Sequence, residues 1–111
     1  MTRLDPKLRK VYILDAGLRM ARLHGYRNMT REDIAVAAGC SEGLVSSYLG
    51  TMTQVRRAVV RHAIFCKDLT VLAQAIAAND PHAMKAPEQL REDAVKSLLE
   101  SQRPTNMSVK K

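Results

Sequence analysis

The sequence of 111 residues is poor in aromatic side chains, with three Tyr, one Phe and no Trp. A core without bulky rings must be built from Leu, Ile, Val, Ala and Met, which suits packed helices better than strands. No run approaches 18 consecutive apolar residues, so we expect no membrane-spanning helix. No apolar run follows the basic N-terminal residues, as a secretory leader would require. The sequence therefore predicts an all-α cytoplasmic protein.

Cysteine and histidine are also sparse, and the two Cys and three His fit no metal-binding motif. We interpret Cys40 and Cys66 as reduced, buried thiols, with a disulfide or a redox switch as the alternative. His24 and His62 are expected at helix surfaces or edges. The sequence offers no Ser/His/Asp or Cys/His arrangement and no Gly-rich phosphate loop. We therefore expect no enzyme, no cofactor and no metal site.

Positive charge is abundant and unevenly distributed. The net charge is +7, and residues 1–31 alone hold eight Lys/Arg against two Asp, a net +6. The other eighty residues contribute the remaining +1. A localised positive field favours a polyanionic partner, most simply nucleic acid, although a solvated helix face would carry the same charges.

Apolar residues recur at helical spacing, bounded by capping residues, along most of the chain. Residues 70–79 either continue the fourth helix or form a separate one after a bend near Lys67–Asp68. Residues 79–87 are expected to break the helical pattern, and the polar tail 102–111 to be disordered. The expected helices span 6–24, 31–38, 42–49, from Thr51 or Thr53 to about 69, and 87–101.

The stretch from 31 to 49 has the spacing of a helix-turn-helix. Ile34-Ala35 is followed after three residues by Gly39, then by Val45 six residues on and Tyr48 three later. A small Ala35 lets the second helix cross, and Gly39 is expected to take a positive φ where a side chain would clash. Such a pair leaves the second helix protruding, which fits the DNA major groove. An ordinary helical hairpin is the alternative.

Residues 11 to about 60 share more with one known family than the helix-turn-helix spacing. This part of the chain closely resembles the N-terminal domain of the TetR (tetracycline-repressor-like) family of transcription regulators. The shared residues are Ile13, Leu14, Ala16, Leu18, Gly25-Tyr26, Thr30, Asp33-Ile34-Ala35, Ala37-Ala38-Gly39, Ser41, Gly43, Tyr48 and Gly50.

This resemblance implies a homodimer that places two recognition helices in successive major grooves of a palindromic operator, with a fourth helix leading to a C-terminal body. About fifty residues follow the head, so we expect dimerisation without the family's inducer pocket and no small-molecule effector. The expected division is a DNA-binding head at 1–50, linking and dimerisation helices at 51–101, and the tail. The protein is expected to bind double-stranded DNA, most simply as a repressor, within the nucleoid.

Four positions depart from the family pattern. The family often has an aromatic residue at Ala21, Lys or Arg at Glu42, Tyr at Ser46 and Lys at Met52. Glu42 would repel phosphate but could accept a hydrogen bond from cytosine N4. The basic arm at 3–10, together with Arg27 and Arg31, is expected to replace the missing cations. The candidate DNA contacts are Arg3, Lys7, Arg27, Thr30, Arg31, Ser41, Glu42, Gly43, Leu44, Ser46, Ser47, Tyr48 and Thr51.

The last helices carry apolar stripes that the head is not expected to need, because its first four helices can close its core. We therefore expect a dimer interface there. An alternative function is that of a protein-interaction adaptor or antitoxin-like module that keeps the helix-turn-helix as a scaffold. The expected interface residues are Leu72, Ile76, Leu90, Ala94, Leu98 and Leu99.

Overall fold

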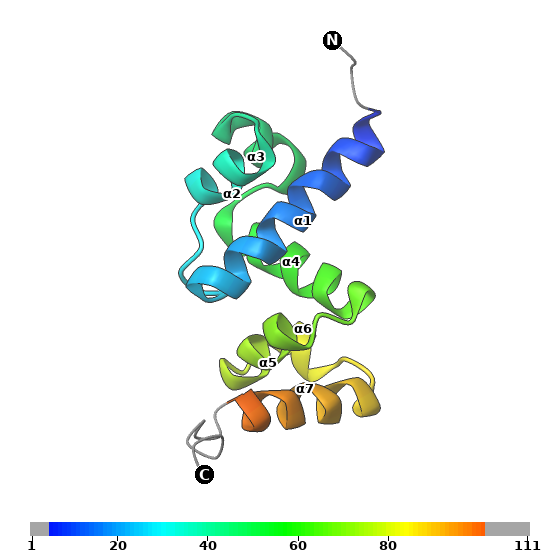
Figure 1. The fold of residues 1–111 in the computed structure, drawn as a ribbon. Helices are drawn as coiled ribbons and strands as arrows, with labels where there is room; N and C mark the ends of the chain where they lie inside the picture. The colour runs from blue at the N-terminus through cyan, green and yellow to red at the C-terminus, as the bar shows by residue number, and fades with distance from the viewer. Residues whose placement is uncertain (1–4, 102–111) are drawn as a thin grey trace.

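The computed structural model describes residues 5–101, which form seven helices and no strand (Figure 1). The all-α fold class is therefore confirmed for this part of the chain. Arg3 and the tail at 102–111 lie outside the described residues. The helices are α1 (Pro6–His24), α2 (Arg31–Ala38), α3 (Glu42–Leu49), α4 (Met52–Cys66), α5 (Leu69–Ala77), α6 (Pro81–Met84) and α7 (Glu88–Ser101).

Local capping signals set the helix starts in the first half of the chain. The Asp5 side chain accepts from Lys7 N–H at the start of α1, where Pro6 occupies the first turn. Thr30 and Asp33 form a reciprocal capping box on α2. Thr51, not Thr53, caps α4, and its box is completed by Gln54. Because these contacts lie within a few residues, the sequence alone located them.

Helices α2 and α4 pack against α1, and α3 packs against α2 and α4. Gly17 is buried in the middle of α1, and a Cβ added there would lie 2.7 Å from Cγ2 of Val59 on α4. The close neighbour that requires glycine here is therefore a side chain. Ile34 of α2 lies on the same side, 4.0 Å from that Cβ position. Gly17 thus allows α1, α2 and α4 to share one core.

The second half of the chain is a layer of three helices beyond α4 (Figure 1). Lys67 takes a left-handed conformation with φ 57°, and Asp68 caps the next helix, so α5 is separate from α4. The expected break at 79–87 was partly wrong, because Asp80 and Pro81 begin the short helix α6. Asp80 accepts from His82 N–H at 2.8 Å and Ala83 N–H at 3.2 Å, which explains this extra turn.

The apolar stripes of α5 and α7 cover each other within one chain. Leu72 and Ala94 are 0% exposed and belong to the same core cluster as Ile13 and Val45 of the head. Their assignment as dimer contacts was therefore wrong, since the chain itself buries them. Ile76, Leu90 and Leu98 are partly buried, and Leu99 is 64% exposed. Only the outer residues of the expected interface are open to a partner.

Polar contacts fasten the head to these helices. Arg22 of α1 pairs with Asp68 at the start of α5. The backbone N–H of Tyr26 donates to Oε1 of Gln74 on α5 at 2.8 Å. The head core is thus continuous with that of the C-terminal helices and is not closed by the first four helices alone.

The far end of α4 is more exposed than its beginning. Val55, Val59 and Ala63 are buried, but Phe65 is 82% exposed and Cys66 is also exposed. The interpretation of Cys66 as a buried thiol was therefore wrong, whereas Cys40 is half-buried. Neither cysteine is in a disulfide. None of the helices within residues 5–101 combines the length and the apolar character needed to cross a bilayer.

Candidate nucleic-acid interface

The turn between α2 and α3 is only three residues long. Gly39 ends α2 with φ 71°, and the N–H of Cys40 donates to the carbonyl of Ala35 at 3.0 Å. Space around Gly39 is open, since an added Cβ would meet nothing within 4 Å. The predicted positive φ is thus confirmed, but the reason for glycine is the left-handed backbone rather than a clash. Ser41 then caps α3 by accepting from Leu44 N–H at 3.1 Å.

One face of α3 is buried and the other is open. Ile34 and Val45 are both 0% exposed and fill the space between α2 and α3, and Ala35 is 4% exposed. Ala38 is only partly buried. Leu49 closes the buried face of α3. This packing holds α3 at the end of the molecule farthest from α7, where a long partner can reach it (Figure 1).

The open face of α3 carries the predicted contact residues. Glu42, Gly43 and Ser47 are exposed, as is Ser41 at the cap. Leu44 and Ser46 are half-exposed, and Tyr48 packs partly against the core. A Cβ at Gly43 would have only Ser41 Oγ nearby, at 3.8 Å. The fold therefore does not require glycine at position 43. Because Gly43 has no side chain, nothing projects from the helix backbone at this position.

The other predicted contacts lie at helix starts or on the connecting turn. Lys7 is exposed in the first turn of α1, and Thr30 and Thr51 are exposed N-caps of α2 and α4. Arg31 is half-buried, and its Nε has no hydrogen-bond partner among the described residues.

A basic groove beside α3 was not predicted from the sequence. It has a volume of about 410 Å³ and lies between the C-terminal half of α3 and α4, with one residue from α1. Its lining holds Ser46 and Ser47 together with three basic side chains, Lys10, Arg57 and Arg61, and no acidic residue. The sequence could have indicated part of this groove, because Arg57 and Arg61 are four residues apart and so share one face of a helix. The position of Lys10 beside them depends on how the helices pack.

Arg27 lies apart from the α3 surface, in a cleft of about 530 Å³. The cleft is formed by the turn after α1, by α4 and by the start of α6. Arg56 and Arg57 share it with Arg27, and Asp80 supplies a negative charge. Because Arg57 lines both this cleft and the groove beside α3, the two basic regions adjoin.

Comparison with known proteins agrees with this geometry. Residues 13–59, which contain α2, α3 and most of α1 and α4, match the family model described as bacterial regulatory proteins, tetR family. Searches among curated proteins and solved structures found no match. The matched segment contains the helix-turn-helix and nearly all of the residues that carried the resemblance noted in the sequence.

Proposed function

Because the chain carries the N-terminal helix-turn-helix domain of a tetR-family regulatory protein, we propose that it is a repressor that binds a palindromic operator as a homodimer. The family match supports DNA binding and transcription regulation. The proposal that α3 reads an operator sequence is supported chiefly by the exposed face of α3 around Gly43, where no side chain projects. A regulator of this kind acts in the cytoplasm, on the DNA of the nucleoid.

In this proposal the exposed face of α3 lies in the major groove. Glu42 accepts a hydrogen bond from a cytosine amino group, and Ser46 and Ser47 bond to base edges. Leu44 contacts a thymine methyl group. Gly43 lets the helix backbone approach the bases, since nothing but hydrogen projects from it. The short polar side chains of α3 also allow its backbone to lie close to the bases.

Phosphate contacts surround this helix. The N-termini of α2 and α4, capped by Thr30 and Thr51, offer backbone N–H groups and the positive ends of helix dipoles. Arg31 supplies a guanidinium whose Nε lacks an internal acceptor. Lys10, Arg57 and Arg61 line the groove beside α3 and extend the positive surface. The family often has basic residues where this chain has Glu42 and Met52. The groups named above take over their role, because the DNA phosphates form a continuous line of negative charge that basic side chains can contact at many points.

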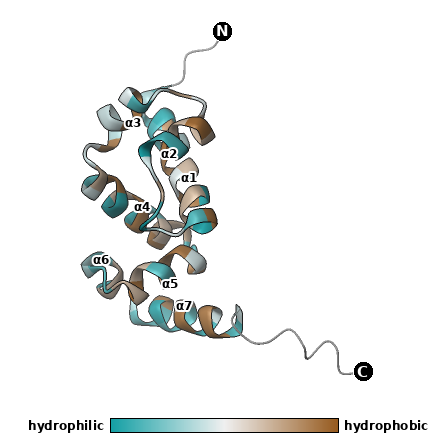
Figure 2. Ribbon diagram, turned by 90° about the vertical axis from the view of Figure 1, so that its left-hand side faces the viewer, coloured by the Kyte–Doolittle hydropathy of each residue, from teal (hydrophilic) through white to brown (hydrophobic). Residues whose placement is uncertain are grey.

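The outer face of α7 is the proposed dimer surface. A groove of about 430 Å³ is lined by Ile76, Met84, Val95 and Leu99, of which Leu99 is 64% exposed. Figure 2 shows hydrophobic and hydrophilic positions interspersed along α7. The rim carries acidic and basic side chains from the same helix, so an antiparallel copy would place unlike charges opposite each other. These rim residues are Glu88, Arg91, Glu92 and Lys96.

No effector site is included in the proposal. The centre of the described C-terminal helices is filled by Leu72, Ala75, Ala83 and Ala94, all 0% exposed. A ligand inside this layer would have to displace side chains that now pack against each other.

The experiment is selection of bound duplexes from a random DNA pool by the purified chain. We expect enrichment of one sequence with two-fold symmetry, whose half-sites lie about one helical turn apart or slightly more. Enrichment of a single half-site would contradict the dimer. A pool that remains random would contradict operator recognition and favour the adaptor alternative. Salt distinguishes that alternative further, because phosphate contacts weaken steeply as salt rises.

A further inference from the structure

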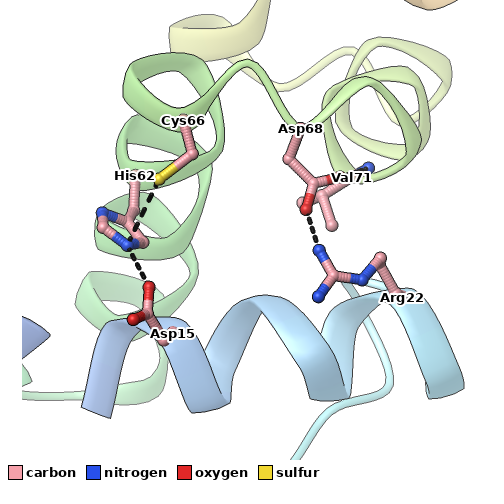
Figure 3. Close-up of polar contacts among 6 residues, drawn as sticks. All are labelled: Asp15, Arg22, His62, Cys66, Asp68 and Val71. Carbon is pink, nitrogen blue, oxygen red and sulfur yellow. Dashed lines mark hydrogen bonds and ion pairs between the residues drawn. The ribbon is translucent and has the colours of Figure 1, made fainter. Parts of the chain in front are cut away.

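Three potential metal ligands converge where α1 crosses the end of α4 (Figure 3). Nε2 of His62 lies 2.8 Å from Oδ1 of Asp15 and 3.6 Å from Sγ of Cys66. The three donor atoms lie within 4.8 Å of one another. His62 and Cys66 are one helical turn apart on α4, and Asp15 comes from α1. The sequence predicted no metal site and did not indicate this cluster, because Asp15 is distant in sequence from His62 and Cys66.

The geometry differs from that of a catalytic relay. In a relay, the carboxylate and the thiol contact opposite nitrogens of the imidazole. Here both lie next to the same nitrogen, Nε2, as Figure 3 shows. The oxygen of Asp15 and the sulfur of Cys66 thus lie on either side of Nε2, and all three atoms can face one common centre. Ligands around an ion are arranged in this way.

The surroundings of the cluster also suit a bound ion. The His62 ring is only 10% exposed and is stacked on Phe65 with centroids 6.3 Å apart, so its orientation is set before any ion arrives. The Asp15 side chain is 46% exposed, and Cys66 is exposed, which leaves a path from solvent. Free cysteines are usually buried, so packing does not explain Cys66.

We propose that Asp15, His62 and Cys66 bind a zinc ion, with solvent in the fourth position. Nitrogen, sulfur and oxygen donors together are typical of zinc sites, and sites with three protein ligands keep one position open. Bond lengths of about 2.0–2.3 Å place tetrahedral donors roughly 3.3–3.6 Å apart. The sulfur already lies at such a distance from Nε2, and the Asp15 oxygen must move outward by about half an ångström. Zinc displaces the thiol proton to solvent, and His62 binds as the neutral imidazole through Nε2, with its one ring proton on Nδ1. The carboxylate and the thiolate then balance the charge of the ion.

The site would fasten α1 to the end of α4. On the other side of the same crossing, Arg22 of α1 pairs with Asp68, which begins α5 (Figure 3). Zinc would thus tie α1 to the end of α4, beside the ion pair that ties α1 to the start of α5. Zinc binding does not depend on the proposed DNA binding, and the two can be measured separately.

Cobalt(II) is the probe, because it replaces zinc and gives a thiolate-to-cobalt charge-transfer band in the ultraviolet. The full reduced chain is titrated anaerobically with cobalt and then with zinc. We expect one cobalt per chain, a charge-transfer band that zinc abolishes, and a rise in Tm with zinc. Absence of the band at micromolar protein and stoichiometric cobalt would overturn the proposal.

Cys40 provides the matched control, since it is the other free thiol of the chain. Cys66→Ser should lose the band and the rise in Tm, while Cys40→Ser should keep both. Asp15→Asn should bind cobalt at least tenfold more weakly. The reverse pattern between the two cysteine variants, or unchanged affinity in Asp15→Asn, would overturn the three-donor site. Circular dichroism of each variant checks that the helices remain folded.

Discussion

The hydroxyl of Tyr26 donates a hydrogen bond to Oδ2 of Asp80, 54 residues further along the chain. Tyr26 lies in the turn between α1 and α2, and Asp80 caps α6 through its other oxygen. Burial and this hydrogen bond raise the pKa of Tyr26 to about 12. The contact fixes the turn that precedes the helix-turn-helix against the C-terminal helices.

Replacing Tyr26 by Phe should destabilise the fold by about 1–3 kcal/mol, because the carboxylate of Asp80 loses its partner in a partly buried place. The ring itself still fills the core. Urea unfolding followed by circular dichroism measures the change. Tyr12→Phe is the control, since Tyr12 is 54% exposed and should change stability little. Equal stability of the Tyr26 variant and the wild type would show that the contact contributes nothing.

The same contact predicts a stability loss at alkaline pH. Folding raises the pKa of Tyr26 from 10.0 to about 12, so the folded state holds this proton more tightly than the unfolded state. Its contribution is complete below pH 10 and is lost as pH rises toward 12. The free energy of unfolding should therefore fall more steeply between these values in the wild type than in Tyr26→Phe. Parallel curves for the two proteins would contradict this assignment.

Gly17→Ala should destabilise the protein although alanine favours helices. The gain in helix propensity is about 1 kcal/mol, whereas overpacking a filled core costs about 1–3 kcal/mol. The added Cβ would lie 2.7 Å from Cγ2 of Val59, which is 0% exposed. We expect a net loss of roughly 1 kcal/mol in denaturant unfolding. The loss should shrink when Val59→Ala makes room, and a stabilised single variant would contradict the packing.

Arg31→Ala and Arg57→Ala should each weaken operator binding and lower the slope of log affinity against log salt by about one. Arg31 has an unpartnered Nε, and Arg57 lines the groove beside α3. Lys85→Ala is the control, since Lys85 is exposed at the end of α6, among the C-terminal helices. Binding titrations at several salt concentrations provide the slopes. A residue whose removal leaves both affinity and slope unchanged is not a phosphate contact.

Leu99→Glu should convert the dimer into a monomer, because a charge would enter the apolar groove of α7. Leu23→Glu provides a matched control: Leu23 is 71% exposed on α1 and does not line that groove. Sedimentation at micromolar concentration should report a dimer for the wild type and for the control variant. A wild-type monomer, both free and on DNA, would contradict the homodimer and the palindromic operator together.

Sequence reasoning located the features that depend on neighbouring residues. The Thr30–Asp33 capping box and the left-handed Gly39 are short-range, so the sequence specified both α2 and its turn into α3. The sequence could not show what covers the apolar face of α5 that contains Leu72. A partner chain and α7 of the same chain would require the same spacing of apolar residues. The approach of Lys10 to Arg61 likewise depends on how α1 crosses α4. Most of the errors thus concern contacts between distant elements.

The most direct measurement compares Gly43→Gln and Gly43→Ala with the wild type on the selected operator. The fold leaves room at this position, because the atom nearest to an added Cβ is Ser41 Oγ at 3.8 Å. Circular dichroism should therefore be unchanged in both variants. If α3 lies in the major groove, glutamine should abolish specific binding, while the single methyl group of alanine should cost much less. Wild-type affinity in Gly43→Gln would show that another surface contacts the DNA.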